Sequence, residues 1–242
     1  FEGVTSYYDD LALVRTQLIT INSYLELVAK TITRVRSTPG RMVQSVADSS
    51  YDTWIKFYRQ DENSPNSLIS YYAKGALVAM GIDLHLRLHS DITFDDVLQG
   101  LWEGYGQVGI GVPENGIQTL AERLSGLSLD DYFQKYVYGT EDVPLAEYLS
   151  EFGLSLHMRA PASNQDAGGK ALNKDQERKG WIGAKFAAAS SGVLLKNVYT
   201  DSPAMNAGLS AGDRIIAINN IEAKSSTIYD QIQSYAPGDV IT

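Results

Sequence analysis

The spacing of apolar residues changes after Gly153, and this change limits the possible folds more than any other feature of the sequence. Before Gly153, apolar residues recur every three or four positions, which is typical of helices that bury one face. The first such stripe is formed by Tyr7, Leu11, Val14 and Leu18. Beyond Gly153, short β-type runs alternate with glycine-containing turns. The sequence therefore predicts a multidomain α plus β chain, in which a helical array precedes a small β-domain.

This pattern divides the chain into three regions. We expect a helical region over residues 1–153, a strand and linker over 154–179, and a β-domain over 180–242. Residues 154–159 alternate like a strand, whereas residues 160–179 are polar and contain almost no large apolar side chain. Within the β-domain we expect strands at 181–186, 192–198 and 214–218, and a short helix at 227–235.

Capping residues and helix breakers locate the expected helices of the first region. After the helix that carries the first stripe, we expect helices at 23–36, 51–58, 67–89, 94–105, 116–124, 129–138 and 144–153. The predicted N-caps are Asn22, Asn66 or Ser67, Thr93, Asn115 and Ser128. Thr93 and Asp96 resemble a capping box with Asp in place of Glu.

Composition excludes several classes of partner and site. The 20 basic and 29 acidic residues give a net charge of −9 without a basic cluster, which argues against nucleic acid and anionic membranes as main partners. No apolar run is long enough to predict a membrane span. The chain has no cysteine, so disulfides and thiolate metal sites are excluded while the compartment stays open. No Gly-rich phosphate loop or Gly-x-Ser-x-Gly motif supports nucleotide binding or serine hydrolysis.

The last third of the chain carries motifs whose order and spacing resemble a bacterial PDZ domain over about residues 180 to 242. They are Gly180-Trp181-Ile182-Gly183, Ser202-Pro203-Ala204 to Ala207-Gly208-Leu209, the run from Ala211 to Asn219, and Pro237-Gly238-Asp239. The resemblance implies that Trp181, Ile182 and Gly183 bind the C-terminus of a peptide, with their N–H groups forming a nest for its carboxylate. The alternative is a packing module whose groove is empty or internally blocked.

Two further motifs, Glu2-Gly3 and Tyr72-Ala73-Lys74-Gly75-Ala76, resemble segments of the glycyl aminopeptidase family of gluzincin zinc metallopeptidases. In that family a PDZ domain follows a thermolysin-like catalytic domain. A more distant likeness to aminopeptidase N rests on the same two segments in the same order. The resemblance implies that the helical region is the second half of the catalytic domain, that Glu2 is the third zinc ligand, and that Tyr72 donates a hydrogen bond to the tetrahedral oxyanion.

Elementary chemistry suits these residue types to those roles, although each residue also has an ordinary interpretation. A catalytic zinc takes three protein ligands, and a carboxylate among them supplies compensating negative charge. A phenol is a neutral donor at pH 7 that can reach an oxygen on which charge develops. The ordinary alternatives are that Glu2 is a solvated first-turn residue and that Tyr72 is a core aromatic residue.

The histidine ligands and general base of the family have no counterpart here, because no His-Glu-x-x-His motif occurs in the 242 residues. His85 and His89 have the i, i+4 spacing of two zinc ligands, but no glutamate lies between them. On a helical wheel they lie about 220° and 260° from Tyr72, away from the expected site. We therefore expect His85 and His89 to be surface or packing residues.

The ends of the sequence suggest a fragment, since it starts at Phe1 and its last residues turn into a strand that stops as it begins. We expect the C-terminal part of a zinc-dependent aminopeptidase that removes N-terminal glycine or other small residues from peptides. Alone, the chain should be inactive and bind no zinc. The alternative is a non-catalytic helical scaffold with a PDZ peptide-binding module. Family analogy favours an extracytoplasmic location, periplasmic or secreted.

Overall fold

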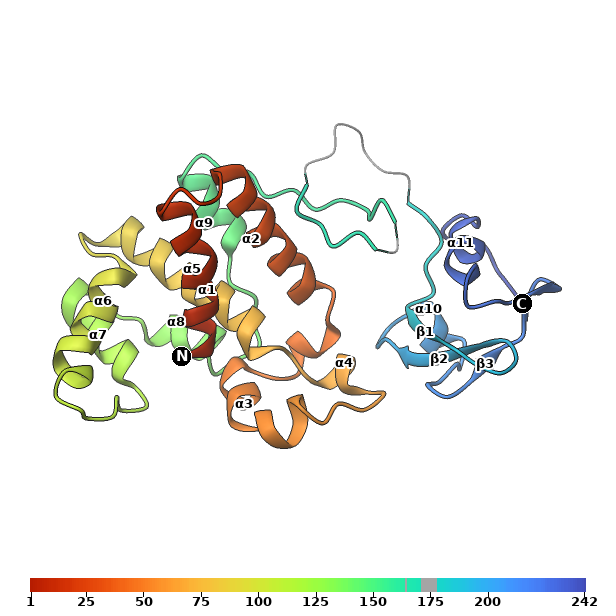
Figure 1. Ribbon diagram of the computed structural model, residues 1–242, viewed down its shortest axis with the longest axis horizontal. Helices are drawn as coiled ribbons and strands as arrows, with labels where there is room; N and C mark the ends of the chain where they lie inside the picture. The colour runs from red at the N-terminus through yellow and green to blue at the C-terminus, as the bar shows by residue number, and fades with distance from the viewer. Residues whose placement is uncertain (164, 171–177) are drawn as a thin grey trace.

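The computed structural model describes residues 1–163, 165–170 and 178–242, and it contains a helical part followed by a smaller part with strands (Figure 1). The helical part consists of α1 (Glu2–Arg15), α2 (Ile21–Arg36), α3 (Val46–Tyr51), α4 (Ser64–Ser67), α5 (Tyr71–His89), α6 (Phe94–Leu101), α7 (Gly116–Ser125), α8 (Asp130–Tyr136) and α9 (Leu145–Glu151). Three shorter helical turns, η1 (Pro39–Met42), η2 (Thr53–Phe57) and η3 (Trp102–Gly106), connect them. None of the helices described is both long and apolar enough to cross a bilayer.

Helix α5 is the centre of the helical part. Thirteen of its nineteen residues are buried, so the helix is enclosed on nearly all sides. Helices α1, α2, α3, α6 and α9 pack against it, and α1 has the most extensive contact. A single apolar cluster joins these helices to α7 and α8.

Two glycines allow α1 to approach α5 closely. A Cβ atom added to Gly3 would lie 2.5 Å from the Cα atom of Gly75, and one added to Gly75 would lie 2.9 Å from the Cα atom of Gly3. Both distances are shorter than any ordinary carbon–carbon contact. The backbones of α1 and α5 therefore touch where the helices cross. This contact requires glycine at both position 3 and position 75.

Buried polar groups fix the orientation of α5. The Asp83 carboxylate accepts hydrogen bonds from the Tyr7 phenol at 2.6 Å, from the Arg87 guanidinium at 3.0 Å and from the Phe94 amide at 3.0 Å. At the other end of α5, Lys74 is only 2% exposed, and its ammonium donates to the carbonyl oxygens of Arg41 and Thr140, both at 2.9 Å. Lys74 thus ties two loops to the central helix.

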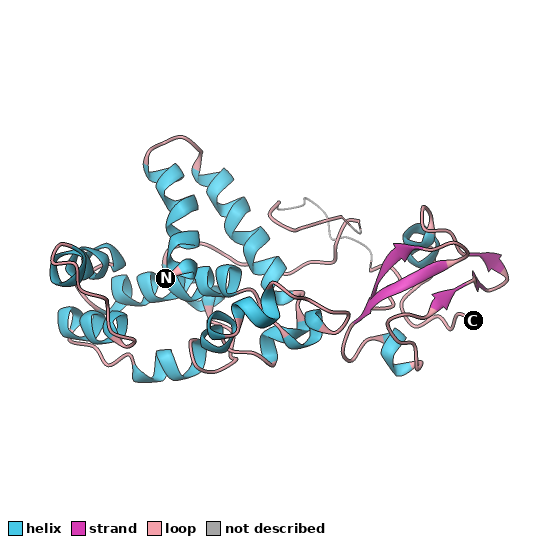
Figure 2. Cartoon of the chain, turned by 60° about the horizontal axis from the view of Figure 1, so that its bottom comes forward, coloured by secondary structure: helices cyan, strands magenta, loops and turns pink. Residues whose placement is uncertain are grey.

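The C-terminal part contains the strands of the described chain (Figure 2). Strands β1 (Ala184–Ala188), β2 (Val193–Val198) and β3 (Arg214–Ile215) form an antiparallel sheet in that order, with an irregular register between Lys185 and Phe186. Strands β4 (Ala217–Ile218) and β5 (Ile221–Glu222) form a hairpin, and α10 (Pro203–Asn206) and α11 (Ile228–Gln233) complete this part. The predicted fold class, a helical array followed by a small β-domain, is confirmed.

Several predicted helix boundaries were wrong because local capping decides them. Thr20, not Asn22, caps α2 by accepting a hydrogen bond from the Ser23 amide. Ser70 caps α5 in the same way, while residues 64–67 form the separate turn α4. Ser128 caps no helix, since α8 begins at Asp130. The capping box at Thr93 and Asp96 is confirmed.

Other predictions of burial and strand formation were also wrong. Leu18 lies beyond the end of α1 and is 74% exposed, because the chain turns at Gln17, where φ is 61°. Residues 154–159 form no strand. Instead, Leu154 and Leu156 pack against the helical core. The predicted linker is described only in part, since residues 164 and 171–177 lie outside the described residues. No strand forms at 237–242 either, where Thr242 hydrogen-bonds Asn219.

We predict that Gly75→Ala destabilises the chain by about 1–3 kcal/mol, because its new Cβ atom would overlap α1. Gly104→Ala is the control, since a Cβ atom there meets nothing within 4 Å. That substitution should be neutral or stabilise by up to ~1 kcal/mol, as expected for a helical glycine. Urea unfolding of both variants measures the difference, and equal effects would contradict a crossing that requires glycine.

We also predict that Lys74→Met destabilises the chain by about 2 kcal/mol or more, because two buried carbonyl oxygens lose their donor. Lys135→Met is the matched control, since Lys135 forms an ion pair with Asp131 on the exposed surface of α8. It should cost less than about 0.5 kcal/mol. Thermal or urea unfolding of the two variants tests this, and a Lys74→Met effect as small as the control's would show that Lys74 does not tie the loops.

Candidate active site

The close crossing of α1 and α5 brings the two predicted active-site residues to one face of the helical part. Glu2 directly precedes Gly3, and Tyr72 lies one helical turn before Gly75. Glu2 is exposed in the first turn of α1, and Tyr72 is half-buried in the first turn of α5. The Glu2 carboxylate lies near enough to contribute to raising the pKa of Tyr72.

The Tyr72 phenol is held in a small hydroxyl cluster. Its oxygen lies 3.3 Å from the Tyr58 hydroxyl, which in turn lies 3.5 Å from the Tyr71 hydroxyl. The pKa of Tyr72 lies above its ordinary value because of the hydrogen bonds with Tyr58 and Tyr71, then because of desolvation, and then because the Glu2 charge disfavours a phenolate. Tyr72 therefore stays protonated at neutral pH and can donate a hydrogen bond.

Aromatic rings surround this hydroxyl cluster. Trp54 stacks on Tyr58 at 5.1 Å, Phe57 meets Tyr71 edge to face at 5.5 Å, and the Tyr71 and Tyr72 rings lie 4.3 Å apart. Trp54 is 77% exposed and Tyr58 is 52% exposed, although the sequence predicts an amphipathic helix at 51–58. The segment is instead the end of α3 followed by the π-helical turn η2, a type of distortion that is frequent at functional sites.

Tyr58 is the residue near Tyr72 that reasoning from sequence missed. It lies in the segment 51–58, which the sequence predicts only as a short amphipathic helix. The signal that could have drawn attention to it is the density of aromatic residues from Tyr51 to Tyr58.

The described residues contain no group of three His, Cys, Asp or Glu side chains that could hold a metal ion. Glu2 offers one carboxylate, so the described part of this chain does not by itself fit a zinc site. His85 lies about 20 Å along α5 from Tyr72. Its ring is 4.6 Å from that of His89 and its Nδ1 atom is 3.2 Å from the Tyr148 hydroxyl. His85 is thus a partly buried packing residue and His89 an exposed surface residue, as expected.

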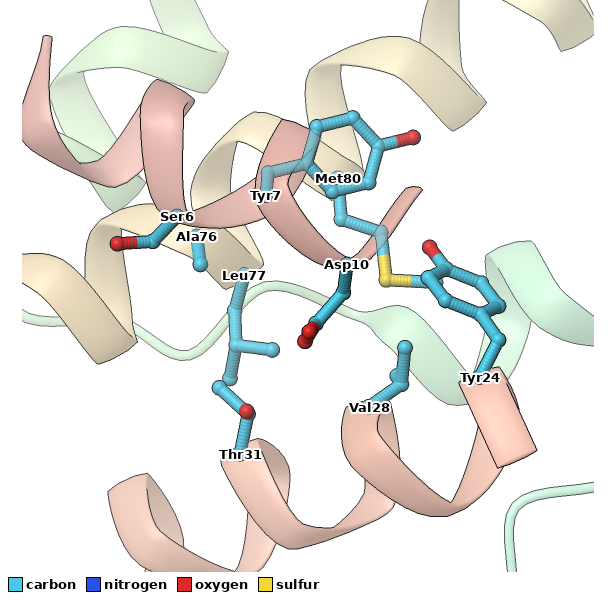
Figure 3. Close-up of a pocket in the computed structure, with 9 residues that line it drawn as sticks. All are labelled: Ser6, Tyr7, Asp10, Tyr24, Val28, Thr31, Ala76, Leu77 and Met80. Atoms are coloured by element: carbon cyan, nitrogen blue, oxygen red, sulfur yellow. The ribbon is translucent and has the colours of Figure 1, made fainter. Parts of the chain in front are cut away.

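Glu2 and Tyr72 line neither of two open pockets of the helical part. The smaller, of about 30 Å³, lies between α1, α2 and α5, and Tyr7, Asp10, Tyr24 and Met80 are among its lining residues (Figure 3). It has room for roughly two waters and for no peptide. The larger, of about 280 Å³, is lined by residues of α2, α5 and α9 together with Asp142 and Met158.

The predicted peptide-binding loop of the C-terminal part lies before β1. Trp181 is 61% exposed, and Gly183 has φ of 75° with no room for a side chain against Ser202. Among the described residues, the N–H groups of Trp181, Ile182 and Gly183 donate to no acceptor. The Ile182 side chain reaches into the apolar core of this part.

A groove of the PDZ type would lie between β1 and α11. In the described chain the outer edge of β1 pairs with no other strand, so its backbone is open to an extended peptide. Phe186 of β1 and Tyr229 of α11 meet edge to face at 4.9 Å, so their rings bridge the strand and the helix. The edge of β1 is thus unpaired within the described sheet, and the Phe186 and Tyr229 rings join β1 to α11.

Comparison with known proteins agrees with these two parts. The family model of M61 glycyl aminopeptidase matches residues 1–78, and that of the PDZ domain matches residues 195–242. No curated protein matches the chain. Among solved structures, the chain is similar to an aminopeptidase N family protein from Idiomarina loihiensis, with 38% identity and a TM-score of 0.88. That likeness covers 100% of this chain but 41% of the other. The chain therefore contains an M61 glycyl aminopeptidase region followed by a PDZ domain.

Proposed function

We propose that this chain forms part of the active site of a zinc-dependent aminopeptidase, with Glu2 as one metal ligand and Tyr72 as a donor to the oxyanion. The observation that carries the proposal is the backbone contact of Gly3 with Gly75, which brings Glu2 and Tyr72 to one face. The M61 match over both residues and the aminopeptidase N-like neighbour support it.

The two side chains suit different parts of the reaction. When bound, zinc lowers the pKa of a water molecule and polarises the carbonyl group of the scissile peptide bond. Glu2 supplies a negatively charged oxygen ligand, which a hard or borderline cation accepts. The neutral Tyr72 phenol donates a hydrogen bond to the carbonyl oxygen as negative charge develops there, and it introduces no charge in the ground state.

The remaining catalytic groups are proposed to come from a polypeptide segment with a His-Glu-x-x-His helix, a motif that these 242 residues do not contain. Two histidines of such a helix would complete the metal site and its glutamate would act as the general base. We accordingly propose that the chain alone hydrolyses no peptide. The printed family description, glycyl aminopeptidase, is our reason to propose N-terminal glycine as the preferred substrate residue.

We predict that Tyr72→Phe, in a polypeptide that also carries the His-Glu-x-x-His segment, lowers kcat by roughly 10²-fold and leaves the zinc content unchanged. Glu2→Gln should instead reduce the zinc content, because it removes the charged ligand. Tyr51→Phe is the control, since Tyr51 is 92% exposed and far less constrained. Elemental analysis and hydrolysis of a glycyl peptide measure both properties.

An unchanged kcat in Tyr72→Phe would remove Tyr72 from the site, and an unchanged zinc content in Glu2→Gln would remove Glu2 from the metal. The 242-residue chain alone provides a further check. Stoichiometric zinc together with peptide hydrolysis in this chain would overturn the proposal that the metal site needs further residues.

A second function is binding of peptide C-termini by the PDZ domain. Among the described residues, the N–H groups of 181–183 donate to no acceptor and the outer edge of β1 pairs with no strand, which favours this function. We predict that the fluorescence of Trp181 changes on titration with peptides that have a free C-terminal carboxylate. Amidation of the same peptides should weaken binding by about tenfold or more, because the carboxylate loses its charge-assisted hydrogen bonds. Equal affinity for both forms, or no binding of either across varied peptides, would favour a packing module instead.

A further inference from the structure

One short segment, residues 58–66, joins the hydroxyl cluster around Tyr72 to the PDZ domain. It begins at Tyr58, whose hydroxyl lies 3.3 Å from that of Tyr72. It ends at Asn66, whose side chain contacts the backbone of the PDZ domain. The two ends of the segment thus touch the proposed active site and the neighbouring domain.

The segment is braced by its own hydrogen bonds. The Ser64 hydroxyl donates to the Asp61 carboxylate and accepts from the Asp61 amide, both at 2.8 Å. The Asn63 carbonyl oxygen accepts from the Asn66 amide at 2.8 Å, and the two asparagine side chains are joined at 3.1 Å. These hydrogen bonds hold residues 61–66 together, and residues 59 and 60 connect them to Tyr58 through the backbone.

Two asparagines form the joint with the PDZ domain. The Asn66 side chain donates to the Val198 carbonyl oxygen at 2.8 Å and accepts from the Thr200 amide at 2.9 Å. Asn197 donates to the Glu62 carbonyl oxygen at 2.9 Å. Asn66 is 8% exposed and Asn197 is 5% exposed, so these hydrogen bonds are shielded from water and losing one leaves a buried polar group unpaired.

The joint continues to the peptide-binding loop. Tyr199 lies between the two residues that Asn66 contacts, and its amide donates to the Gly183 carbonyl oxygen at 2.8 Å. The rings of Tyr199 and Trp181 are stacked at 6.4 Å. Contacts therefore join Tyr72 to Tyr58 at one end of the segment. At the other end they join Asn66 to Val198 and Thr200, and Tyr199 between them joins the loop at Gly183.

We propose that the PDZ domain supports the active site, a role that we call the buttress. The hydrogen bonds of Asn66 and Asn197 fix the segment 58–66 and so hold Tyr58 in place. Tyr58 is then a positioning residue that orients the Tyr72 phenol. The consequence for catalysis rests on the proposed function. The geometric part does not, because the orientation of Tyr72 can be measured in this chain without any reaction.

The geometric part is tested by NMR of the 242-residue chain with ¹³C-labelled tyrosine rings, in which the Tyr72 signal is assigned with Tyr72→Phe. Asn66→Ala and Asn197→Ala should each move the Tyr72 ring signal in the direction that Tyr58→Phe moves it. The Thr200 amide should exchange with solvent at least about tenfold faster in Asn66→Ala, because its acceptor is lost. The control Asn206→Ala, on the exposed surface of α10, should change neither the Tyr72 ring signal nor the exchange rate of the Thr200 amide.

The catalytic part is tested by kcat and KM in the polypeptide that also carries the His-Glu-x-x-His segment. Tyr58→Phe and Asn197→Ala should each lower kcat by about fivefold, the worth of one hydrogen bond, with KM changed less than twofold. If these residues had a purely structural role, the substitutions would lower the amount of active enzyme but not the kcat of each active molecule. Active-site titration measures that amount and so distinguishes the two cases. If Tyr72→Phe itself leaves kcat unchanged, the proposed function fails. The NMR experiment still tests whether the PDZ domain orients the Tyr72 ring.

The buttress proposal is overturned if the Thr200 amide exchanges faster in Asn66→Ala but the Tyr72 ring signal in both Asn66→Ala and Asn197→Ala equals that of the unsubstituted chain. It is equally overturned if Tyr58→Phe leaves the Tyr72 signal unmoved. Asn197→Ala leaves the hydrogen bonds of Asn66 in place, so it remains informative if Asn66→Ala does not fold.

Discussion

The contact of Gly3 with Gly75 is the constraint on which the candidate site depends. Any side chain at either position would separate α1 from α5, and the separation would move the Glu2 carboxylate away from Tyr72. The glycines of the Glu-Gly and Tyr-x-Lys-Gly motifs are thus structural, as is Lys74, whose ammonium ties two loops to α5. Glu2 and Tyr72, the residues proposed to take part in the reaction, are exposed and half-buried, respectively, beside this buried junction.

The M61 region and the PDZ domain share more than a covalent link. Each has its own apolar clusters, yet Asn66 and Asn197 join them by buried hydrogen bonds. The similarity to the aminopeptidase N family structure extends over both parts at once, with a TM-score of 0.88. The PDZ domain is therefore held against the helical part by specific contacts as well as by the chain that connects them.

The sequence was sufficient for the fold class and for the two motif-bearing helices, because helical periodicity and the glycine motifs are local signals. It was not sufficient for the start of α5, where Ser70 rather than Ser67 supplies the cap, nor for the exposure of Trp54 and Leu18. The contact of Tyr58 with Tyr72 and the asparagine joint could not be predicted, since a contact such as Asn66 with Thr200 joins residues far apart in the chain and leaves no periodic pattern in the sequence.

The most direct measurement is a crystal structure of the longer polypeptide, containing the His-Glu-x-x-His segment, with zinc and an aminophosphonate analogue of the tetrahedral intermediate. We predict a Glu2 oxygen about 2.0–2.2 Å from the zinc ion and the Tyr72 hydroxyl within hydrogen-bond distance of a phosphonate oxygen. A zinc ion bound by other residues, with Glu2 in solvent and Tyr72 turned away from the analogue, would contradict it.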